Sequence, residues 1–379
     1  MFKNRYSDVI IEFQIKNWRN FMKRILFTIF MAACFLGLTG CGDDQLESKT
    51  EVWDAKYEDL CQRSDSYLSS VKFTGAVLVA KGDKVVFAKG YGLTDSKDPS
   101  SAPVSINSNL EIGSITKQFT ASAIMQLQEK KLLSVDDKIS KYFPDYVYGD
   151  KITIKNLLSM RSGINPNIYF SDELIAEGLK VLESGNHLDD NFWLKFMNNQ
   201  PLTKDPGKLF FYDNLNYVLL GKIVEKVSGK SYSEYVQEHF FDPCKMTHSN
   251  LVSGNVDVKA YDHNGNVLSF PDEYSLGAGG MNSSVVDLFR WMQKFSKGKI
   301  VSRKSLMDMT INRAKENYEY GYGLRYNGNM IYHDGSTFTY NSTLMYDVAT
   351  KTTIVVLCNR STHEKNANSF GTALAAFWK

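Results

Sequence analysis

Short runs of β-branched, aromatic and small apolar residues lie near both ends of the chain. Residues 73–80 and 85–90 form two such runs, and Lys81-Gly82-Asp83-Lys84 separates them. This arrangement predicts a β-hairpin. Beyond residue 318 the same kind of pattern predicts four more strands and a closing helix, at residues 322–326, 330–333, 342–347, 352–358 and 367–379.

The middle of the chain has apolar residues at three- and four-residue spacing, which is typical of amphipathic helices. Strands at both ends and helices between them predict an α+β fold. We expect one antiparallel β-sheet flanked by helices (about residues 52–112 and 287–379), with an inserted, mainly helical domain (about 113–286). The helices with the clearest pattern are expected at residues 51–69, 115–133, 214–227, 232–241 and 287–295.

The first 41 residues indicate an export signal. Lys23 and Arg24 precede an apolar run at residues 25–38, which is short for a bilayer span but suits a signal-peptide core. The run ends in Leu-Thr-Gly-Cys41, which resembles the bacterial lipobox, whose cysteine receives lipid. The alternative is a short membrane anchor, or a buried helix in which Cys41 is incidental.

Met22 itself begins a well-formed signal peptide, so residues 1–21 are expected to be dispensable or to precede the true start. Residues 42–51 form a polar, acidic tether. Two lipid signals give stable membrane anchoring. We therefore expect a lipoprotein exported to the bacterial cell envelope, either in the periplasm or at the cell surface.

Composition indicates an ordinary globular protein, with 43% hydrophobic and 23% charged residues. The formal net charge of +2 comes from the leader. The first 40 residues hold six basic and two acidic side chains, which leaves 38 basic and 40 acidic ones in residues 41–379. A nucleic-acid-binding surface needs a basic excess, so we expect no nucleic-acid partner.

Cysteine and histidine positions show no metal-binding pattern. Cys34 lies in the leader and Cys41 at the lipobox, which leaves Cys61, Cys244 and Cys358. One disulfide among these three is possible in an oxidising envelope, but three separate buried thiols are favoured. The six histidines are scattered, and HExxH and CxxC motifs are absent, so we expect neither a metal nor another cofactor.

The motif Ser-x-x-Lys occurs three times, and the copy at Ser114 and Lys117 is the one placed for chemistry. It follows Gly113 at the head of a predicted helix, where the spacing puts hydroxyl and amine on one face. The helix N-terminus adds partial positive charge and free N–H groups. A semi-buried lysine there has a lowered pKa and can accept the serine proton. The alternative is a solvent-facing pair on an ordinary helix.

Tyr212 begins the one Tyr-x-Asn sequence of the chain, which ends at Asn214. A phenol between cations has a lowered pKa and can act as a base. The amide of Asn214 can position Lys117 and a substrate carbonyl. The alternative is that Tyr212 is a core aromatic residue at the head of the next helix.

The third candidate is His-Asp-Gly-Ser at residues 333–336, at the end of a predicted strand. Gly335 would let the backbone approach a substrate closely, and the N–H of Ser336 can donate to an oxyanion. A similar sequence at residues 263–265 lies in a polar turn and is not a candidate.

Together the three motifs resemble the serine β-lactamase and penicillin-binding-protein superfamily, with its Ser-x-x-Lys nucleophile. The nearest branch in appearance is the class C β-lactamase-related serine hydrolases, which include DD-peptidases, D-aminopeptidases and esterases. The resemblance runs from about residue 73 to the C-terminus and implies an antiparallel sheet flanked by helices plus a helical domain. Family-like segments lie at residues 111–120, 132–139, 152–158, 162–163, 206–207, 219–229, 278–280 and 322–324.

The resemblance implies a role for each candidate. Ser114 would be the acylated nucleophile, with Lys117 and Tyr212 as the proton-transfer pair. Asn214 would orient the lysine and the substrate. The backbone N–H groups of Ser114 and Ser336 would form the oxyanion hole. No Gly-x-Ser-x-Gly elbow occurs, which argues against an α/β-hydrolase.

On the predicted strand, His333 and Gly335 would contact substrate, and His333 falls where many relatives carry Lys. Asp334 departs from the family pattern, in which a Thr helps to bind the substrate carboxylate. If Asp334 faces the cleft, its charge opposes the carboxylate of β-lactams and D-Ala-D-Ala peptides, at a cost on the order of 1 kcal/mol or more. The alternative is that Asp334 points away from the cleft.

We therefore expect a serine hydrolase that uses an acyl-Ser114 intermediate on a small-molecule or peptide substrate with an amide or ester bond. A DD-peptidase, a penicillin-binding protein or a true β-lactamase is the alternative within this class. A different class is a non-catalytic envelope binding protein on the same scaffold. The intact Ser, Lys and Tyr set argues against a non-catalytic protein.

Overall fold

The computed structural model describes residues 46–269, 271–311, 313, 319–360 and 366–379. The chain divides into two units, Met1–Ser48 and Lys49–Lys379. The predicted signal peptide and Cys41 lie outside the described residues, so both stay predictions. Among the residues that are described, none forms a helix with the length and apolar character of a membrane span.

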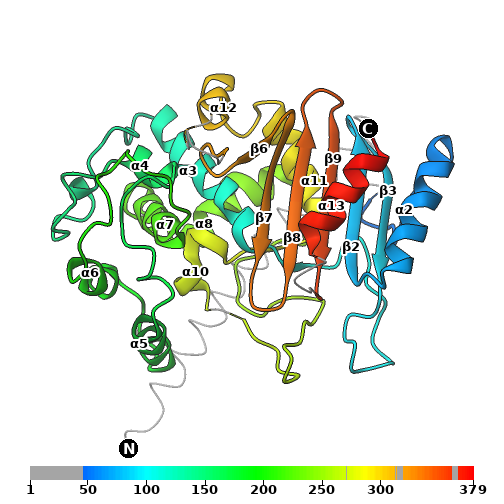
Figure 1. Ribbon diagram of the computed structural model, residues 1–379, viewed down its shortest axis with the longest axis horizontal. Helices are drawn as coiled ribbons and strands as arrows, with labels where there is room; N and C mark the ends of the chain where they lie inside the picture. The colour runs from blue at the N-terminus through cyan, green and yellow to red at the C-terminus, as the bar shows by residue number, and fades with distance from the viewer. Residues whose placement is uncertain (1–45, 270, 312, 314–318, 361–365) are drawn as a thin grey trace, which may run out of the picture. The chain divides into compact units, whose positions relative to one another are not determined.

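A seven-stranded antiparallel sheet lies at the centre of the second unit, in the order β1-β3-β2-β9-β8-β7-β6 (Figure 1). Strand β2 pairs with β9 along its whole length, so the first and last parts of the unit share one sheet. A separate two-stranded sheet joins β4 and β5. The strands are β1 (Val52–Trp53), β2 (Gly75–Lys81), β3 (Lys84–Tyr91), β4 (Leu110–Glu111), β5 (Asn282–Ser283), β6 (Arg325–Asn327), β7 (Met330–Ser336), β8 (Asn341–Asp347) and β9 (Thr352–Cys358).

Helices cover both faces of the sheet, and a further group of helices lies beside its β6–β7 end (Figure 1). The predicted fold class, an antiparallel sheet with flanking helices, is confirmed. The helices are η1 (Ala55–Tyr57), α2 (Glu58–Ser70), η2 (Gly113–Ile115), α3 (Thr116–Glu129), η3 (Ile139–Lys141), α4 (Ile154–Leu158), α5 (Asp172–Glu183), α6 (Asp190–Asn198), α7 (Asn214–Ser228), α8 (Tyr232–Val236), η4 (Gln237–Phe241), α9 (Asp242–Cys244), α10 (Asp272–Gly279), α11 (Val285–Ser296), α12 (Arg303–Met309) and α13 (Ala367–Phe377).

The central strands are apolar throughout because both of their faces are covered. Successive side chains of a strand point to opposite faces. Val77 and Val79 of β2 therefore join Val356 of β9 in the core beneath α2 and α13. Helix α11 packs on β2 and β9 from the other side (Figure 1). Burial of each such valine contributes roughly 1.5 kcal/mol or more.

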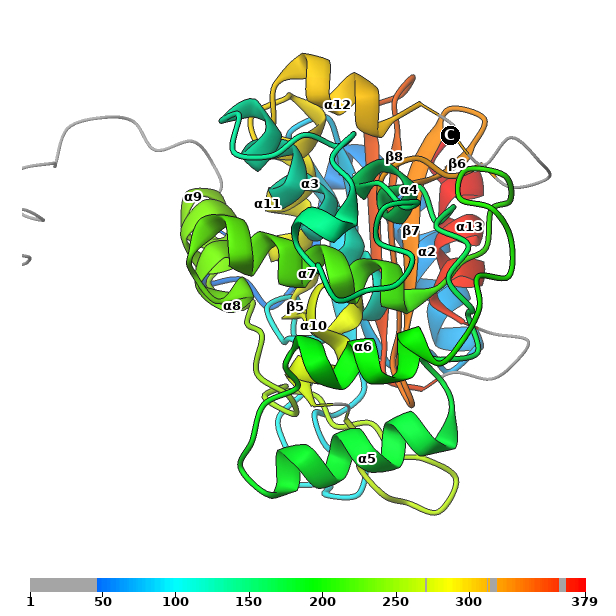
Figure 2. The same cartoon turned by 90° about the vertical axis from the view of Figure 1, so that its left-hand side faces the viewer.

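Helix α3 is buried along most of its length and packs against α7 and α10. Figure 2 faces this helical region. The ring of Phe119 stacks on Trp291 of α11 with centroids 3.9 Å apart. A helix that is buried on all sides has a fixed position, so α3 is a rigid support for residues at its N-terminus. The proposed boundaries of the helical domain stay a prediction.

The hairpin of β2 and β3 is confirmed, with Lys81 opposite Lys84 and a turn of Gly82 and Asp83 between them. The helix predicted from residue 51 is wrong in its first part, because α2 begins at Glu58. Residues Val52–Trp53 instead pair with the edge of β3 as β1. Such a pairing joins distant parts of the chain, and a local periodicity does not reveal it.

The strand predicted at residues 322–326 is also wrong at its start, because β6 begins at Arg325. Gly323 adopts a φ of +69° and lies against α3. A Cβ at Gly323 would lie 2.5 Å from the carbonyl oxygen of Lys117. The chain therefore turns closely over α3 before it enters the sheet.

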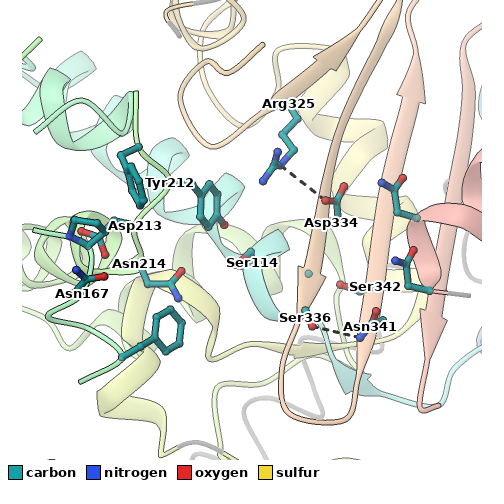
Figure 3. A pocket seen from close by; sticks show the side chains of 16 residues that line it. Ser114, Asn167, Tyr212, Asp213, Asn214, Arg325, Asp334, Ser336, Asn341 and Ser342 are labelled. Atoms are coloured by element: carbon teal, nitrogen blue, oxygen red, sulfur yellow. Dashed lines mark hydrogen bonds and ion pairs between the residues drawn. The ribbon is translucent and has the colours of Figure 1, made fainter. Parts of the chain in front are cut away.

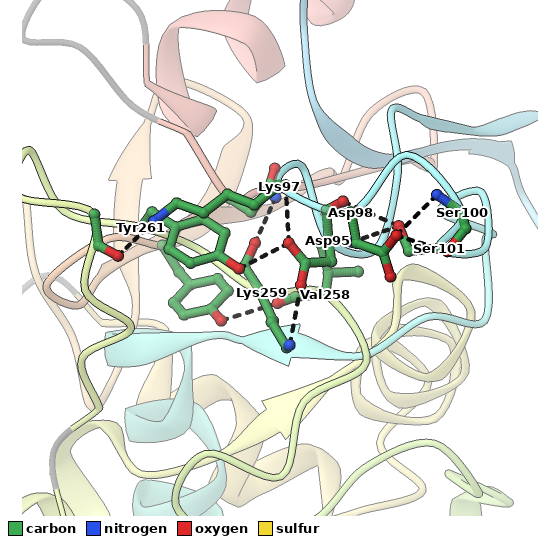
Figure 4. Close-up of polar contacts among 11 residues, drawn as sticks. Asp95, Lys97, Asp98, Ser100, Ser101, Val258, Lys259 and Tyr261 are labelled. Atoms are coloured by element: carbon green, nitrogen blue, oxygen red, sulfur yellow. Dashed lines mark hydrogen bonds and ion pairs between the residues drawn. The ribbon is translucent and has the colours of Figure 1, made fainter.

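Asp95 fixes the loop that follows β3 to a loop from the middle of the chain (Figure 4). Its carboxylate accepts hydrogen bonds from Tyr261 Oη at 2.7 Å and from Lys259 Nζ at 3.0 Å. The backbone N–H of Lys97 donates to the same carboxylate at 2.9 Å. These hydrogen bonds, with that of Tyr261 foremost, hold the pKa of Asp95 at about 2.

Candidate active site

Ser114 lies in the turn η2, directly before the buried helix α3. Gly113 precedes it with a φ of +49°, a conformation that favours glycine. A Cβ at Gly113 would lie 2.8 Å from the backbone nitrogen of Ser336 on β7. Glycine therefore allows the turn at Ser114 and the strand to touch, and Ser114 borders a cavity at this junction.

Lys117 is fully buried and points its amine at Ser114. Its Nζ lies 2.9 Å from Ser114 Oγ, 2.8 Å from Asn214 Oδ1 and 2.6 Å from the carbonyl oxygen of Ala278. Burial is the main reason why the pKa of Lys117 lies well below its usual value. The positive charge of Arg325 lowers the pKa further, and Asp213 opposes both effects.

A neutral Lys117 fits these three partners well. A neutral amine has two N–H donors and one lone pair. Asn214 Oδ1 and the carbonyl oxygen of Ala278 can only accept, so they take the two donors. The lone pair is then left for the hydroxyl of Ser114, which can donate its proton to Nζ.

Tyr212 lies over the same group of atoms, close enough to Ser114 for the serine hydroxyl to lower the pKa of the phenol. Its ring centroid is 5.0 Å from Lys117 Nζ and 5.1 Å from the Arg325 guanidinium carbon. Burial raises the pKa of Tyr212, and this outweighs the opposite effects of Ser114 and Arg325. The prediction of a lowered pKa is therefore wrong. A protonated phenol here can still relay a proton between Ser114 and another group.

Gly335 and Ser336 bring β7 against the turn that holds Ser114. A Cβ at Gly335 would lie 1.9 Å from the carbonyl oxygen of Ile112, so only glycine allows this approach. Thr337 N donates to Tyr340 O at 3.0 Å. In an antiparallel pair hydrogen-bonded and non-hydrogen-bonded positions alternate. The N–H of Ser336 therefore points away from β8 and toward Gly113.

The two predicted oxyanion donors thus lie close together, on either side of Gly113. The N–H of Ser114 is at a helix N-terminus, where backbone donors are free. The N–H of Ser336 approaches it across Gly113. A carbonyl oxygen placed between them could accept both hydrogen bonds. Their role as an oxyanion hole stays a prediction.

The cavity beside Ser114 has a volume of about 850 Å³ and is open to solvent (Figure 3). It brings together Tyr212, Asn214, Gly335 and Ser336, with Lys117 buried beneath Ser114. The cavity is also lined by residues that could not be predicted from the sequence. These are Pro166, Asn167, Phe170, Phe211, Asp213, Arg325, Asn341, Ser342, Asn366 and Asn368.

His333 is not among the residues that line this cavity, and its predicted contact with substrate stays a prediction. It is fully buried, with Nε2 3.2 Å from Tyr320 Oη and Nδ1 2.7 Å from the carbonyl oxygen of Asp334. Its ring packs near that of Tyr212, with centroids 6.1 Å apart. Neighbouring side chains on a strand point to opposite faces, so Asp334 is the residue that faces the cavity.

Asp213 is a buried carboxyl group in the cavity wall. It caps α7, where Oδ1 accepts from Leu215 N at 3.1 Å and Oδ2 accepts from Asn216 Nδ2 at 3.3 Å. Burial raises its pKa from 3.8 to about 7, against the opposing effects of the Leu215 hydrogen bond and of Lys117. The sequence gives no hint of this, because aspartate is a common helix cap.

The described part of the chain has no cluster of metal-binding side chains at the site. Among the described residues, no group of three or more His, Cys, Asp or Glu side chains could hold a metal. Cys61, Cys244 and Cys358 are all buried and free. The hydroxyl of Ser114, the amine of Lys117 and the phenol of Tyr212 therefore stay the candidate reacting groups at the cavity.

The fold and the site together define a member of the serine β-lactamase and penicillin-binding-protein superfamily. A family profile named Beta-lactamase matches residues 68–376, so the chain belongs to the Beta-lactamase family.

Several known proteins are similar to this chain. The Bacillus subtilis protein PbpX, named as a penicillin-binding protein, is 29% identical over 70% of this chain and 66% of its own length. Protein flp of Staphylococcus aureus is 30% identical over 75% of this chain and 59% of its own length. The chain thus spans less than two thirds of the length of either relative.

Solved structures agree with the fold. An octameric penicillin-binding protein homologue from Pyrococcus abyssi has a TM-score of 0.70 and 30% identity, with 84% of this chain and 77% of that chain covered. A D-amino acid amidase from Ochrobactrum anthropi has a TM-score of 0.71 with 86% and 98% covered. The amidase is only 20% identical, so it shows the fold alone.

The buried carboxyl of Asp213 predicts a stability change with pH. Its pKa is about 7 in the folded state and 3.8 ordinarily. Between these values the folded state keeps a proton that the unfolded state has lost, so stability falls as pH rises from about 4 to about 7. Asp213→Asn removes this titration and keeps a helix-capping oxygen. We compare the free energy of unfolding of the variant with that of wild type at each pH. The variant's value relative to wild type should be at least about 1 kcal/mol higher at pH 8 than at pH 4.

Urea unfolding at both pH values measures this difference. The exposed Asp205→Asn serves as the matched control and should show no such change. If Asp213→Asn changes the free energy of unfolding by the same amount at pH 4 and at pH 8, burial does not raise the pKa of Asp213.

Proposed function

We propose that this protein is an exported, lipid-anchored serine hydrolase that acts through an acyl-Ser114 intermediate on an amide or ester substrate. One observation carries the proposal. The amine of Lys117 is buried, has a lowered pKa and lies 2.9 Å from Ser114 Oγ at the edge of an open cavity. The lipid anchor is proposed from the sequence around Cys41.

In the first half of the reaction, Ser114 Oγ attacks the substrate carbonyl carbon and its proton passes to Lys117 Nζ. The developing oxyanion accepts hydrogen bonds from the N–H groups of Ser114 and Ser336. When the carbon–nitrogen or carbon–oxygen bond breaks, the proton moves from Lys117 through Tyr212 to the leaving group. An ester then remains between Ser114 and the acyl group.

Water completes the reaction. It gives a proton to the Lys117 and Tyr212 pair and attacks the acyl carbon. The ester bond to Ser114 breaks, and Ser114 Oγ takes the proton back. The three side chains return to their starting protonation states, so no cofactor is required.

A DD-peptidase or penicillin-binding activity is the second candidate, because PbpX is named as a penicillin-binding protein. A true β-lactamase has less support, since Asp334 places a carboxylate in the cavity. Turnover of nitrocefin, a D-Ala-D-Ala peptide and a short p-nitrophenyl ester separates these activities. A non-catalytic binding protein would turn over none of them.

Ser114→Ala tests the nucleophile directly. A fluorophosphonate probe should add its mass to the wild-type protein and not to the variant, because the alanine offers no hydroxyl. Intact-mass spectrometry measures both. Equal labelling of the two proteins would remove Ser114 from the mechanism, and Ser69→Ala, at another Ser-x-x-Lys motif, should label like wild type.

Gly335→Ala tests the approach of β7 to the nucleophile turn. The added Cβ would lie 1.9 Å from Ile112 O and would push Ser336 away from Ser114. We expect the rate of probe labelling to fall at least about 100-fold. Gly280→Ala is the control, because its Cβ would meet its nearest atom at an ordinary 3.5 Å. Wild-type labelling by a folded Gly335→Ala protein would speak against the oxyanion assignment.

Asn214→Asp tests the protonation state of Lys117. A carboxylate 2.8 Å from Nζ favours the ammonium form and so raises the pKa of Lys117. Less neutral amine is then present at low pH, and the acidic limb of the ester-hydrolysis profile should move to higher pH. The exposed Asn186→Asp is the matched control. An unmoved acidic limb would argue against Lys117 as the base.

A further inference from the structure

Arg325 and Asp334 form an ion pair in the cavity wall that the proposed mechanism does not use. They come from neighbouring strands, β6 and β7, and both side chains line the cavity (Figure 3). Arg325 Nε lies 3.9 Å from Asp334 Oδ2, and 29% and 32% of the two side chains are exposed. The pair is therefore within reach of a bound molecule.

The two side chains do not satisfy each other's hydrogen-bonding atoms. Its separation of 3.9 Å is too long for a hydrogen bond. Arg325 Nε and Asp334 Oδ1 are both buried, and neither has a hydrogen-bond partner among the described residues. Buried polar atoms without partners cost stability. Because the pair costs stability, support of the fold does not explain why both side chains are present. A role in substrate discrimination does explain it.

The pair lies near the residues proposed to act on the leaving group and the oxyanion. The guanidinium carbon of Arg325 is 5.1 Å from the ring centroid of Tyr212, the residue proposed to pass the proton to the leaving group. Asp334 precedes Ser336 by two residues on β7. Residues two apart on a strand share a face and are separated by roughly 7 Å. A single small substrate could therefore contact both Asp334 and the proposed oxyanion donor Ser336, which line the same cavity.

Asp334 changes what Arg325 can do there. An unpaired guanidinium would attract a carboxylate on the leaving group. With Asp334 beside it, the positive charge is balanced, and an incoming carboxylate also meets a like charge in a partly desolvated site. A neutral amide or alcohol meets neither penalty and can hydrogen-bond to both side chains.

We propose that the Arg325–Asp334 pair selects substrates whose leaving group is uncharged, because Asp334 prevents Arg325 from binding a carboxylate. This inference rests on the proposed serine hydrolase activity and narrows its substrate class. The substrate is then a neutral amide or ester on the leaving-group side, rather than a peptide with a free terminal carboxylate.

Two esters with the same acyl group test the selection. One has a 3-carboxyphenyl leaving group and the other a 3-carbamoylphenyl leaving group, which is uncharged and of similar shape. Wild type should have the higher kcat/KM for the carbamoyl ester. Asp334→Asn frees Arg325, and the carboxy-to-carbamoyl ratio of kcat/KM should rise at least about tenfold.

Arg325→Gln should move the same ratio in the opposite direction, because it leaves Asp334 without its cation. The double variant should lose the gain of Asp334→Asn. Asp145→Asn, an exposed carboxylate that does not line the cavity, should leave the ratio unchanged. Asp334→Thr should repeat the gain of Asp334→Asn if the asparagine variant does not fold.

The outcomes separate the two proposals. Ser114-dependent turnover of the carbamoyl ester, with a ratio that neither Asp334 variant nor Arg325→Gln changes, would overturn the selection and leave the hydrolase intact. Absence of turnover of either ester, with no acylation of Ser114, would overturn the hydrolase and the selection together.

Discussion

The amine of Lys117 lies in a space that excludes water, between α3, α7 and α10. An isolated ammonium group in such a space costs several kcal/mol. Among the described residues no carboxylate forms an ion pair with Nζ, and the more distant Asp213 offsets only part of the cost. The neighbours are one amide oxygen, one backbone oxygen and the hydroxyl of Ser114. Burial therefore favours the neutral amine, and a neutral amine beside a serine is a base.

The rest of the fold keeps this arrangement in place. The long helix α3 is buried on nearly all sides, so its first turn is rigid. Helix α7 brings Asn214, α10 brings the oxygen of Ala278, and β7 brings the N–H of Ser336. Close contacts at Gly113, Gly323 and Gly335 let these segments approach without side chains between them. Pairing of β2 with β9 then joins the strands β9, β8 and β7 to the hairpin of β2 and β3 in one sheet.

Much of this could be predicted from local sequence patterns. The hairpin and the strands after residue 330 follow from short apolar runs, and the spacing of Ser114 and Lys117 follows from helix geometry. Their convergence with Tyr212 could be expected only from the resemblance to a family. Contacts between distant segments were missed, as with β1, which pairs with β3 over 30 residues away.

The residues that line the cavity were the hardest to predict. A shift of one residue in a strand exchanges its two faces, so the sequence did not decide between His333 and Asp334 as the residue in the cavity. Arg325 was missed because Gly323 turns the chain just before β6. Asn167, Phe170 and Phe211 lie in loops whose course depends on tertiary packing.

The protonation state of Lys117 is the claim on which the account rests most directly. NMR titration of the protein labelled with ¹³C-lysine, with the Lys117 signal assigned by Lys117→Arg, measures it. The account predicts a Lys117 Cε signal that reports a neutral amine at pH 7 while the exposed lysines remain charged. A Lys117 signal that titrates together with the exposed lysines would contradict it.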